Sequence, residues 1–213
     1  MEKFNHIELN NEVTKRGDNG FFKLEKDIEA IEEFLREVDF RTVKFSSEMK
    51  RLRYLVEENF YYNIFDKYIE DEILECLELA ANFKFEFKSY MAASKFYKDY
   101  ALKTNDKKQY LENFNQHVFI VAMYLADGDV ALAKELMISM LEQRLQPATP
   151  TFLNSGRSRR GELVSCFLLE VGDSLNSINY IDSTAKQLSK IGGGVAINLS
   201  KLRARGESIK GIN

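Results

Sequence analysis

Cys166 is the residue of this chain whose type and setting most directly suggest chemistry. Arg157, Arg159 and Arg160 precede it closely, and cations that approach a thiol favour the thiolate, which is the reactive form. A structural alternative is that Cys166 fills the core, because unpaired cysteine is among the residue types most often buried. The residues alone leave both interpretations open. The other cysteine, Cys76, lies on the apolar stripe of a predicted helix and is expected in the core.

Segments rich in hydroxyl groups and in glycine flank this cysteine. Thr149-Pro150-Thr151 is predicted to be rigid and extended, with hydroxyls and backbone N–H groups that suit phosphate or ribose, although turns of this composition are common. Gly192–Gly194 would let a ligand approach the backbone closely, although the end of a helix would explain at least one of these glycines. Their spacing is not that of a dinucleotide-binding fingerprint.

A second pattern suited to anions begins at Asp173. Asp173, Ser174 and Leu175 stand at the predicted start of a helix, where such side chains cap the backbone and where the helix N-terminus attracts phosphate. Arg203 and Lys210 follow and would add positive charge. A cap without any ligand explains the first three residues equally well.

The composition is that of an ordinary globular protein, with 45% apolar and 30% charged residues. Residues 147–213 carry a net charge of +4 and the remainder −7, so the positive charge is local and suits a small anionic ligand better than a nucleic-acid surface. His6 and His117 are too few and too far apart for a metal site. Two cysteines without a disulfide framework, with no secretory signal or membrane-spanning run, predict a cytoplasmic location.

Apolar residues recur with helical spacing in the part of the chain that precedes the first proline, Pro147. One predicted helix places Ile28, Phe34 and Leu35 on a single stripe, and Asp129 is positioned to cap another. This part of the sequence therefore predicts an all-α bundle. The expected helices are residues 26–38, 47–57, 71–81, 89–102, 107–126 and 129–143.

The pattern then changes to strand, helix, strand. Gly161–Val171 is apolar on both faces, as expected of a fully buried parallel strand. A helix is predicted from Ser174 to about Lys190, and Val195–Leu199 is predicted as a second strand. This order opens an α/β unit. Two strands alone leave apolar edges unpaired, so the sequence predicts the beginning of a larger sheet.

Taken together, these segments resemble the large (α) subunit of class Ib ribonucleotide reductase. The resemblance follows the order of the family's motifs along almost the whole chain, and it covers only the first part of the family's usual length. The matching segments are Tyr100–Lys107, Gln146–Asn154, Arg160–Leu169, Gln187–Gly194 and Asn198–Ala204.

The resemblance implies an N-terminal all-α helical domain followed by the first strands and helix of an incomplete ten-stranded α/β barrel. The helical domain is expected over residues 1–146, and the truncated start of the barrel over residues 147–213. A shortened ATP-cone-like start is expected first, where Val13–Arg16 resembles in part the activity-site motif of related reductases. The implied activity is the radical-based reduction of ribonucleoside diphosphates to 2′-deoxyribonucleoside diphosphates for DNA synthesis.

The resemblance also implies roles for individual residues. Cys166 corresponds to the first of two cysteines that supply the reducing electrons and become a disulfide. Four residues correspond to substrate contacts: Thr149, Ser165, Cys166 and Gly194. Five correspond to part of the allosteric site that binds a deoxynucleotide or ATP effector: Asp173, Ser174, Leu175, Arg203 and Lys210.

The expected partners are a second α subunit, a smaller radical-generating β subunit, a glutaredoxin-like reductant and the C-terminal part of the α subunit. Neither a membrane nor a nucleic acid is expected to bind. The resemblance implies no cofactor in this chain, because the dimetal–tyrosyl radical belongs to the β subunit. The thiyl-radical cysteine and the second redox cysteine normally lie beyond residue 213, so the chain alone is expected to be inactive.

The end at Asn213 is compatible with an intron, an intein, a split gene or a truncation, and the sequence does not choose among them. An alternative function is a non-catalytic helical module that binds a nucleotide or a protein partner.

Overall fold

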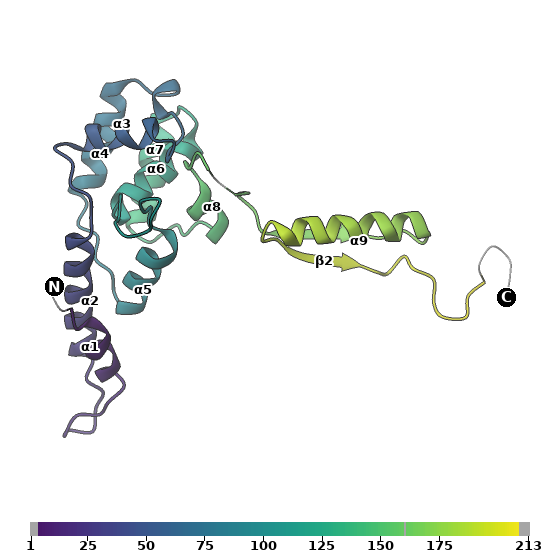
Figure 1. The fold of residues 1–213 in the computed structure, drawn as a ribbon, viewed down its shortest axis with the longest axis horizontal. Coiled ribbons are helices and arrows are strands. Elements are labelled where there is room, and N and C mark those ends of the chain that lie inside the picture. The colour runs from purple at the N-terminus through teal and green to yellow at the C-terminus, as the bar shows by residue number, and fades with distance from the viewer. Residues whose placement is uncertain (1–3, 160, 209–213) are drawn as a thin grey trace. The chain divides into compact units, whose positions relative to one another are not determined.

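The structure, a computed structural model, describes residues 4–159 and 161–208. It divides into two compact units. The helical unit comprises Met1–Pro147 and Ser155–Arg160, and the second unit comprises Ala148–Asn154 and Gly161–Asn213. The chain therefore enters the second unit, returns to the helical unit for one short segment and enters the second unit again. Figure 1 shows the elements of both units along the chain.

The helical unit follows the apolar periodicity of the sequence. Its helices begin with side-chain caps at several positions, because Ser, Asn and Asp oxygens accept the first free backbone N–H groups. Ser47 accepts from Lys50 N–H and Ser89 from Ala92 N–H, both at 3.2 Å. The elements are α1 (His6–Glu12), α2 (Glu25–Phe40), α3 (Glu48–Glu57), the 3₁₀ turn η1 (Ile64–Asp66), α4 (Glu70–Asn82), α5 (Tyr90–Lys95), the π turn η2 (Phe96–Tyr100), α6 (Phe114–Ala126) and α7 (Val130–Leu141).

α6 is the central helix of this unit. The side chains of Val118–Met123 are fully buried, as expected of a helix that is apolar around its whole circumference, and α4 and α7 pack against it. A reciprocal pair of hydrogen bonds between Asn113 and Gln116 fixes its start. Cys76 of α4 is fully buried, so its predicted place in the core is confirmed.

Two predicted helices are shorter in the structure. The helix expected over 107–126 begins only at Phe114, because the preceding segment folds back on itself, with the Leu111 N–H donating to the Leu102 carbonyl at 2.9 Å. The helix expected over 89–102 ends at Lys95 and continues as the π turn η2. Apolar spacing alone does not reveal either change in backbone hydrogen bonding.

The second unit contains α8 (Thr149–Asn154), β1 (Cys166–Glu170), α9 (Leu175–Lys190) and β2 (Gly194–Asn198). β1 and β2 form a parallel two-stranded sheet, and α9 packs against both strands. The predicted order of elements is confirmed: an all-α part precedes two parallel strands with one helix between them.

Two details of this unit correct the predictions. Thr149-Pro150-Thr151 is not extended but opens the short helix α8, since a helix tolerates proline in its first turn, where the missing N–H has no intrahelical partner. The strand predicted over Gly161–Val171 is limited to β1 and is not fully buried. Its side chains alternate between exposed and half-buried, because one helix covers one face of the sheet.

Candidate functional site

Cys166 is the first residue of β1, and its side chain is exposed. It lies opposite Gly194 in the parallel register, and the Gly194 N–H donates to the Ser165 carbonyl at 2.6 Å. Successive side chains of a strand point to opposite faces, so Cys166 shares the open face of the sheet with Leu168, while Phe167 is on the half-buried face. Within the part of the chain that the structure describes, Cys166 therefore does not belong to a hydrophobic core.

A hollow of about 320 Å³ lies next to the start of β1. Thr149, the first residue of α8, and Ser165, which directly precedes β1, both line this hollow. Two of the four predicted substrate contacts thus line the hollow, whereas Cys166 and Gly194, although paired with each other next to Ser165, do not belong to the lining. The lining consists of Thr149, Pro150, Leu153, Asn154, Gly161, Glu162, Val164, Ser165, Phe167, Ile191, Gly192 and Gly193.

Two side-chain hydrogen bonds join the two walls of this hollow. Thr151 Oγ1 donates to the Leu163 carbonyl at 3.0 Å, and Asn154 Nδ2 donates to the Glu162 carbonyl at 2.8 Å. α8 is therefore fastened to the segment that leads into β1. A hollow of this volume, mostly apolar but with a few hydroxyl groups and glycine backbone in its lining, has the size to hold part of a small ligand.

The glycines of Gly192–Gly194 have separate structural reasons. Gly192 has a φ of +92° where α9 ends, which confirms that a helix end explains one of them. A Cβ atom on Gly193 would lie 2.5 Å from Phe167 Cε2 and 2.9 Å from the Leu188 carbonyl oxygen, so only glycine fits. Because both residues line the hollow, a ligand there would also meet bare backbone.

The other predicted residues gather at the start of α9. Ser174 caps this helix by accepting the Ser177 N–H at 3.2 Å, and Leu175 is exposed. Arg203 donates from Nε to the Asp173 carboxylate at 2.7 Å and from Nη2 to the Asp173 carbonyl at 3.4 Å. A guanidinium group therefore stands beside a helix N-terminus, where anions are attracted. Lys210 lies outside the described residues.

The helical unit contains a buried ionic cluster that sequence reasoning missed, formed by Tyr61, Glu112, His117 and Arg157. Glu112 and His117 are fully buried, and Arg157 is 8% exposed. Arg157 binds the Glu112 carboxylate through both terminal nitrogens, at 2.5 Å and 3.4 Å. His117 Nδ1 lies 2.9 Å from the same carboxylate, and the Tyr61 hydroxyl donates to it. The Leu102 N–H adds a further hydrogen bond at 2.7 Å.

Charged neighbours outweigh burial in this cluster. Burial alone would raise the pKa of Glu112, but the Arg157 guanidinium and His117 hold that pKa well below its ordinary value. Burial also opposes the charged form of Arg157, yet Glu112 raises the pKa of Arg157. Burial raises the pKa of Tyr61, so its phenol stays protonated and remains a donor. Glu112 and Arg157 therefore form a permanently ionised pair.

This cluster changes the role predicted for Arg157. The sequence suggests Arg157 as a cation that activates Cys166, but its guanidinium is committed to Glu112 and to the Tyr100 carbonyl at 3.2 Å. Arg159 is exposed, and Arg160 lies outside the described residues. A faint sequence signal for the cluster exists in Glu112, a carboxylate that follows Tyr110 and Leu111 and directly precedes Asn113, the N-cap of α6.

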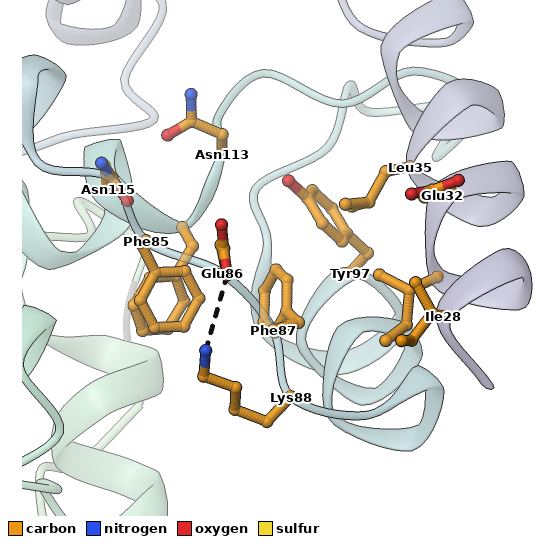
Figure 2. A pocket seen from close by; sticks show the side chains of 12 residues that line it. Ile28, Glu32, Leu35, Phe85, Glu86, Phe87, Lys88, Tyr97, Asn113 and Asn115 are labelled. Atoms are coloured by element: carbon orange, nitrogen blue, oxygen red, sulfur yellow. Dashed lines mark hydrogen bonds and ion pairs between the residues drawn. The ribbon is translucent and has the colours of Figure 1, made fainter. Parts of the chain in front are cut away.

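The helical unit also carries a groove of about 710 Å³, which Figure 2 shows between α2 and the segment around Phe87. Phe85 stacks on Phe114 with ring centroids 3.9 Å apart, and Lys88 Nζ lies 3.5 Å from the Glu86 carboxylate at the rim. Ile28, 62% exposed and predicted on the core stripe of its helix, lines this groove instead. No motif in the sequence predicts this groove.

Both histidines have structural partners. His6 lies 2.8 Å from Tyr90 and 2.8 Å from Glu37, and His117 belongs to the buried ionic cluster. Among residues 4–159 and 161–208, no group of three or more His, Cys, Asp or Glu side chains is placed to hold a metal ion. Within the same residues, every helix is too short or too polar to cross a membrane.

Three profiles of one protein family match the chain in succession. Residues 6–85 match the ribonucleotide reductase N-terminal region, residues 86–160 its all-alpha domain and residues 164–213 its barrel domain. The chain is 51% identical over 208 residues to the ribonucleoside-diphosphate reductase subunit alpha of Bacillus subtilis (strain 168). The aligned region covers 97% of this chain and 30% of that protein.

Two further relatives agree with this match. The NrdEB subunit alpha of ribonucleoside-diphosphate reductase from Bacillus subtilis (strain 168) is 51% identical over 210 residues, covering 98% of this chain and 19% of that protein. The subunit alpha from Mycoplasma pneumoniae is 41% identical over 209 residues, covering 97% of this chain and 28% of that protein. The chain thus spans less than a third of the length of these curated relatives.

Proposed function

We propose that this chain, which is homologous to the N-terminal part of ribonucleoside-diphosphate reductase α subunits, supplies the first part of the catalytic machinery of a class Ib reductase. The family is an oxidoreductase family, and this chain contains only part of the enzyme. The activity proposed for the complete protein is the reduction of ribonucleoside diphosphates to their 2′-deoxy forms.

One observation carries this proposal: an exposed cysteine begins a barrel strand beside a small hollow whose lining includes the hydroxyl groups of Thr149 and Ser165. Cys166 is accessible, Ser165 next to it lines the hollow, and Thr149 lines the same hollow from α8. In the proposed assignment, Thr149 and Ser165 contact the substrate's polar groups, Gly194 admits the substrate to the backbone, and Cys166 is the electron donor. The accessible thiol supports this role, because a sealed one could not exchange electrons with a substrate or a reductant.

The proposed overall chemistry balances with two thiols. Cys166 and a second cysteine, which this chain does not contain, supply two electrons and two protons. The C2′–OH bond of the ribose breaks, the hydroxyl leaves as water, a C2′–H bond forms, and the two sulfur atoms join as a disulfide. An external dithiol reductant then restores both thiols by disulfide exchange. Cys76 is not suited as the second cysteine, because it is fully buried in α4.

The start of α9 is proposed as part of the allosteric site. Arg203 beside the helix N-terminus favours the phosphates of a deoxynucleotide or ATP effector. Asp173 already pairs with Arg203, so the effector has to share or displace that contact. Ser174 and Leu175 would contact the effector from the first turn of α9, and Lys210 would add a second cation. The shortened ATP-cone-like start stays a prediction; in the structure, Arg16 donates to the Gly20 carbonyl at 3.2 Å and lies over the Phe22 ring.

The proposed partners follow from the family and not from any contact in this structure. They are the rest of the α subunit, a second α subunit, a radical-generating β subunit that carries the dimetal–tyrosyl radical, and a glutaredoxin-like reductant. Such an assembly would act in the cytoplasm, where both free cysteines of this chain stay reduced. The chain 1–213 by itself is expected to be inactive, since it holds one accessible thiol.

The test replaces Cys166 by serine in the complete α subunit and assays it with its β subunit and a dithiol reductant. We expect Cys166→Ser to keep its fold and its nucleotide binding but to lose multiple turnover, because no disulfide can form. Cys76→Ala is the matched control, since it removes the other thiol from the buried core and should retain turnover. Near-normal turnover of Cys166→Ser would contradict the redox role.

A further inference from the structure

The walls of the hollow are joined through a segment that belongs to the helical unit. α8 ends at Asn154, and the chain re-enters the second unit at Gly161; both residues line the hollow. Residues 155–160 between them belong to the helical unit. We call residues 155–159, the described part of this segment, the tip. Because α8 runs directly into the tip at Ser155, whatever holds the tip also holds the end of the α8 wall.

The tip is anchored tightly in the helical unit. Ser155 is fully buried, and Gly156 accepts the Tyr62 N–H at its carbonyl at 3.1 Å. Gly156 has a φ of +76°, and a Cβ atom there would lie 2.6 Å from Ile120 Cγ1 on the central helix. Ser158 donates its N–H to the Phe60 carbonyl at 3.0 Å. Hydrogen bonds and close packing therefore hold the backbone of the tip against the helical unit.

Arg157 is the charged element of this anchor. Its two contacts with the Glu112 carboxylate and its contact with the Tyr100 carbonyl tie it to two residues of the helical unit. Glu112 is held in turn by the Leu102 N–H, just beyond the π turn η2. A bidentate, buried pair fixes direction as well as distance, because a guanidinium and a carboxylate meet in one plane.

We propose that Glu112 and Arg157 are positioning residues for the substrate hollow. By fixing the tip, they hold the α8 wall, with Thr149, against the segment that leads into Cys166. The hydrogen bonds from Thr151 and Asn154 then join the anchored α8 to the other wall of the hollow. The link to substrate rests on the proposed function, whereas the anchoring of α8 does not depend on it.

The test compares three variants of the complete α subunit that carries this chain, assayed with its radical-generating partner. Arg157→Lys keeps the charge but loses the bidentate contact. Gly156→Ala leaves the charges intact but forces a side chain against Ile120. Ile73→Ala is the control, because it removes a fully buried side chain of α4 outside the tip and the cluster. Amide hydrogen exchange in α8 and steady-state kinetics are measured for each.

Both tip variants should let the α8 amides exchange about tenfold faster and raise the KM for the ribonucleoside diphosphate about fivefold. The affinity for a deoxynucleotide effector should stay within about twofold, because the start of α9 has its own hydrogen bonds. Ile73→Ala should change neither the α8 exchange rate nor the KM, even if its melting temperature falls as far as that of the tip variants.

Unchanged α8 exchange and KM in both tip variants overturn the inference, and so do equal changes in the control. Faster α8 exchange with an unchanged KM removes the positioning role and leaves only an anchor. A wild-type protein that does not reduce ribonucleoside diphosphates refutes the proposed function, while the exchange rates still decide whether Arg157 and Gly156 hold α8.

Discussion

Replacing Glu112 by glutamine tests how much of the helical unit's stability depends on the buried ionic cluster. Glutamine keeps the shape of the side chain but removes the negative charge that faces Arg157 and His117. Those groups stay buried, and the guanidinium then lacks its counter-ion. Removing one partner of a buried ion pair costs about 3–5 kcal/mol, which is a large part of the stability of an ordinary domain. A loss of this size is therefore expected for Glu112→Gln.

The assay is urea unfolding at pH 7, followed by far-UV circular dichroism. Glu29→Gln is the matched control, because it makes the same substitution in an exposed pair with Lys26, which solvent screens. We expect a clear fall in the unfolding free energy for Glu112→Gln and almost none for Glu29→Gln. Equal, small losses in both variants would refute the reasoning, since they would mean that Arg157 finds other compensation.

The pH dependence gives a second check with a definite sign. The pKa of Glu112 is depressed in the folded state, so its stabilising contribution is present above the unfolded value of about 4.3 and is lost as the pH falls toward the folded value. Wild type should therefore lose about 1 kcal/mol of this contribution between pH 7 and roughly pH 3.5. Glutamine does not titrate, so the difference in unfolding free energy between wild type and Glu112→Gln should narrow on acidification. A difference that widens would contradict the assigned pKa shift.

Three further substitutions test single contacts. Gly193→Ala should destabilise the second unit by about 1–3 kcal/mol, because the Phe167 ring and the Leu188 carbonyl must move; unchanged hydrogen-exchange protection in β2 would speak against this. Asp129→Ala should cost about 1 kcal/mol in urea unfolding, since it removes the 3.0 Å cap of the Leu132 N–H, and a neutral result would show that water replaces it. Arg203→Ala should weaken binding of a deoxynucleotide effector about tenfold in equilibrium dialysis, with substrate binding unchanged; wild-type effector affinity would place the effector site elsewhere.

Local sequence patterns predicted the parts of the structure that depend on residues close together in the chain. The helix from Ser174 to Lys190 combines a cap, an apolar stripe and a terminating glycine within one short window, and α9 agrees with it almost to the residue. Cys76 was placed in the core by its position on one helical stripe, and it is fully buried. The two parallel strands followed from apolar runs on either side of that helix.

Contacts between distant residues explain what the sequence could not reveal. Glu112 and Arg157 are 45 residues apart, and no spacing rule connects an arginine after α8 with a carboxylate before α6. The helix α8 was missed because Pro150 suggests an extended chain, although proline is also acceptable in the first turn of a helix. The exposure of Cys166 depends on which elements cover each face of the sheet, and a strand's own composition does not specify that.

The open face of the sheet connects the fold with the proposed chemistry. Leu168 is 85% exposed on the same face as Cys166, and leaving such a side chain in water forfeits about 1.5–3 kcal/mol of burial energy. A strand that displays a large apolar side chain next to an accessible thiol is suited to an interior that further strands enclose, since enclosure would bury Leu168 and keep water away from reactive sulfur chemistry. The barrel-domain match over residues 164–213 agrees with this explanation. In the proposed complete subunit, further barrel strands would cover the face that carries Cys166, whereas the walls of the hollow beside it are joined within this chain by Thr151 and Asn154.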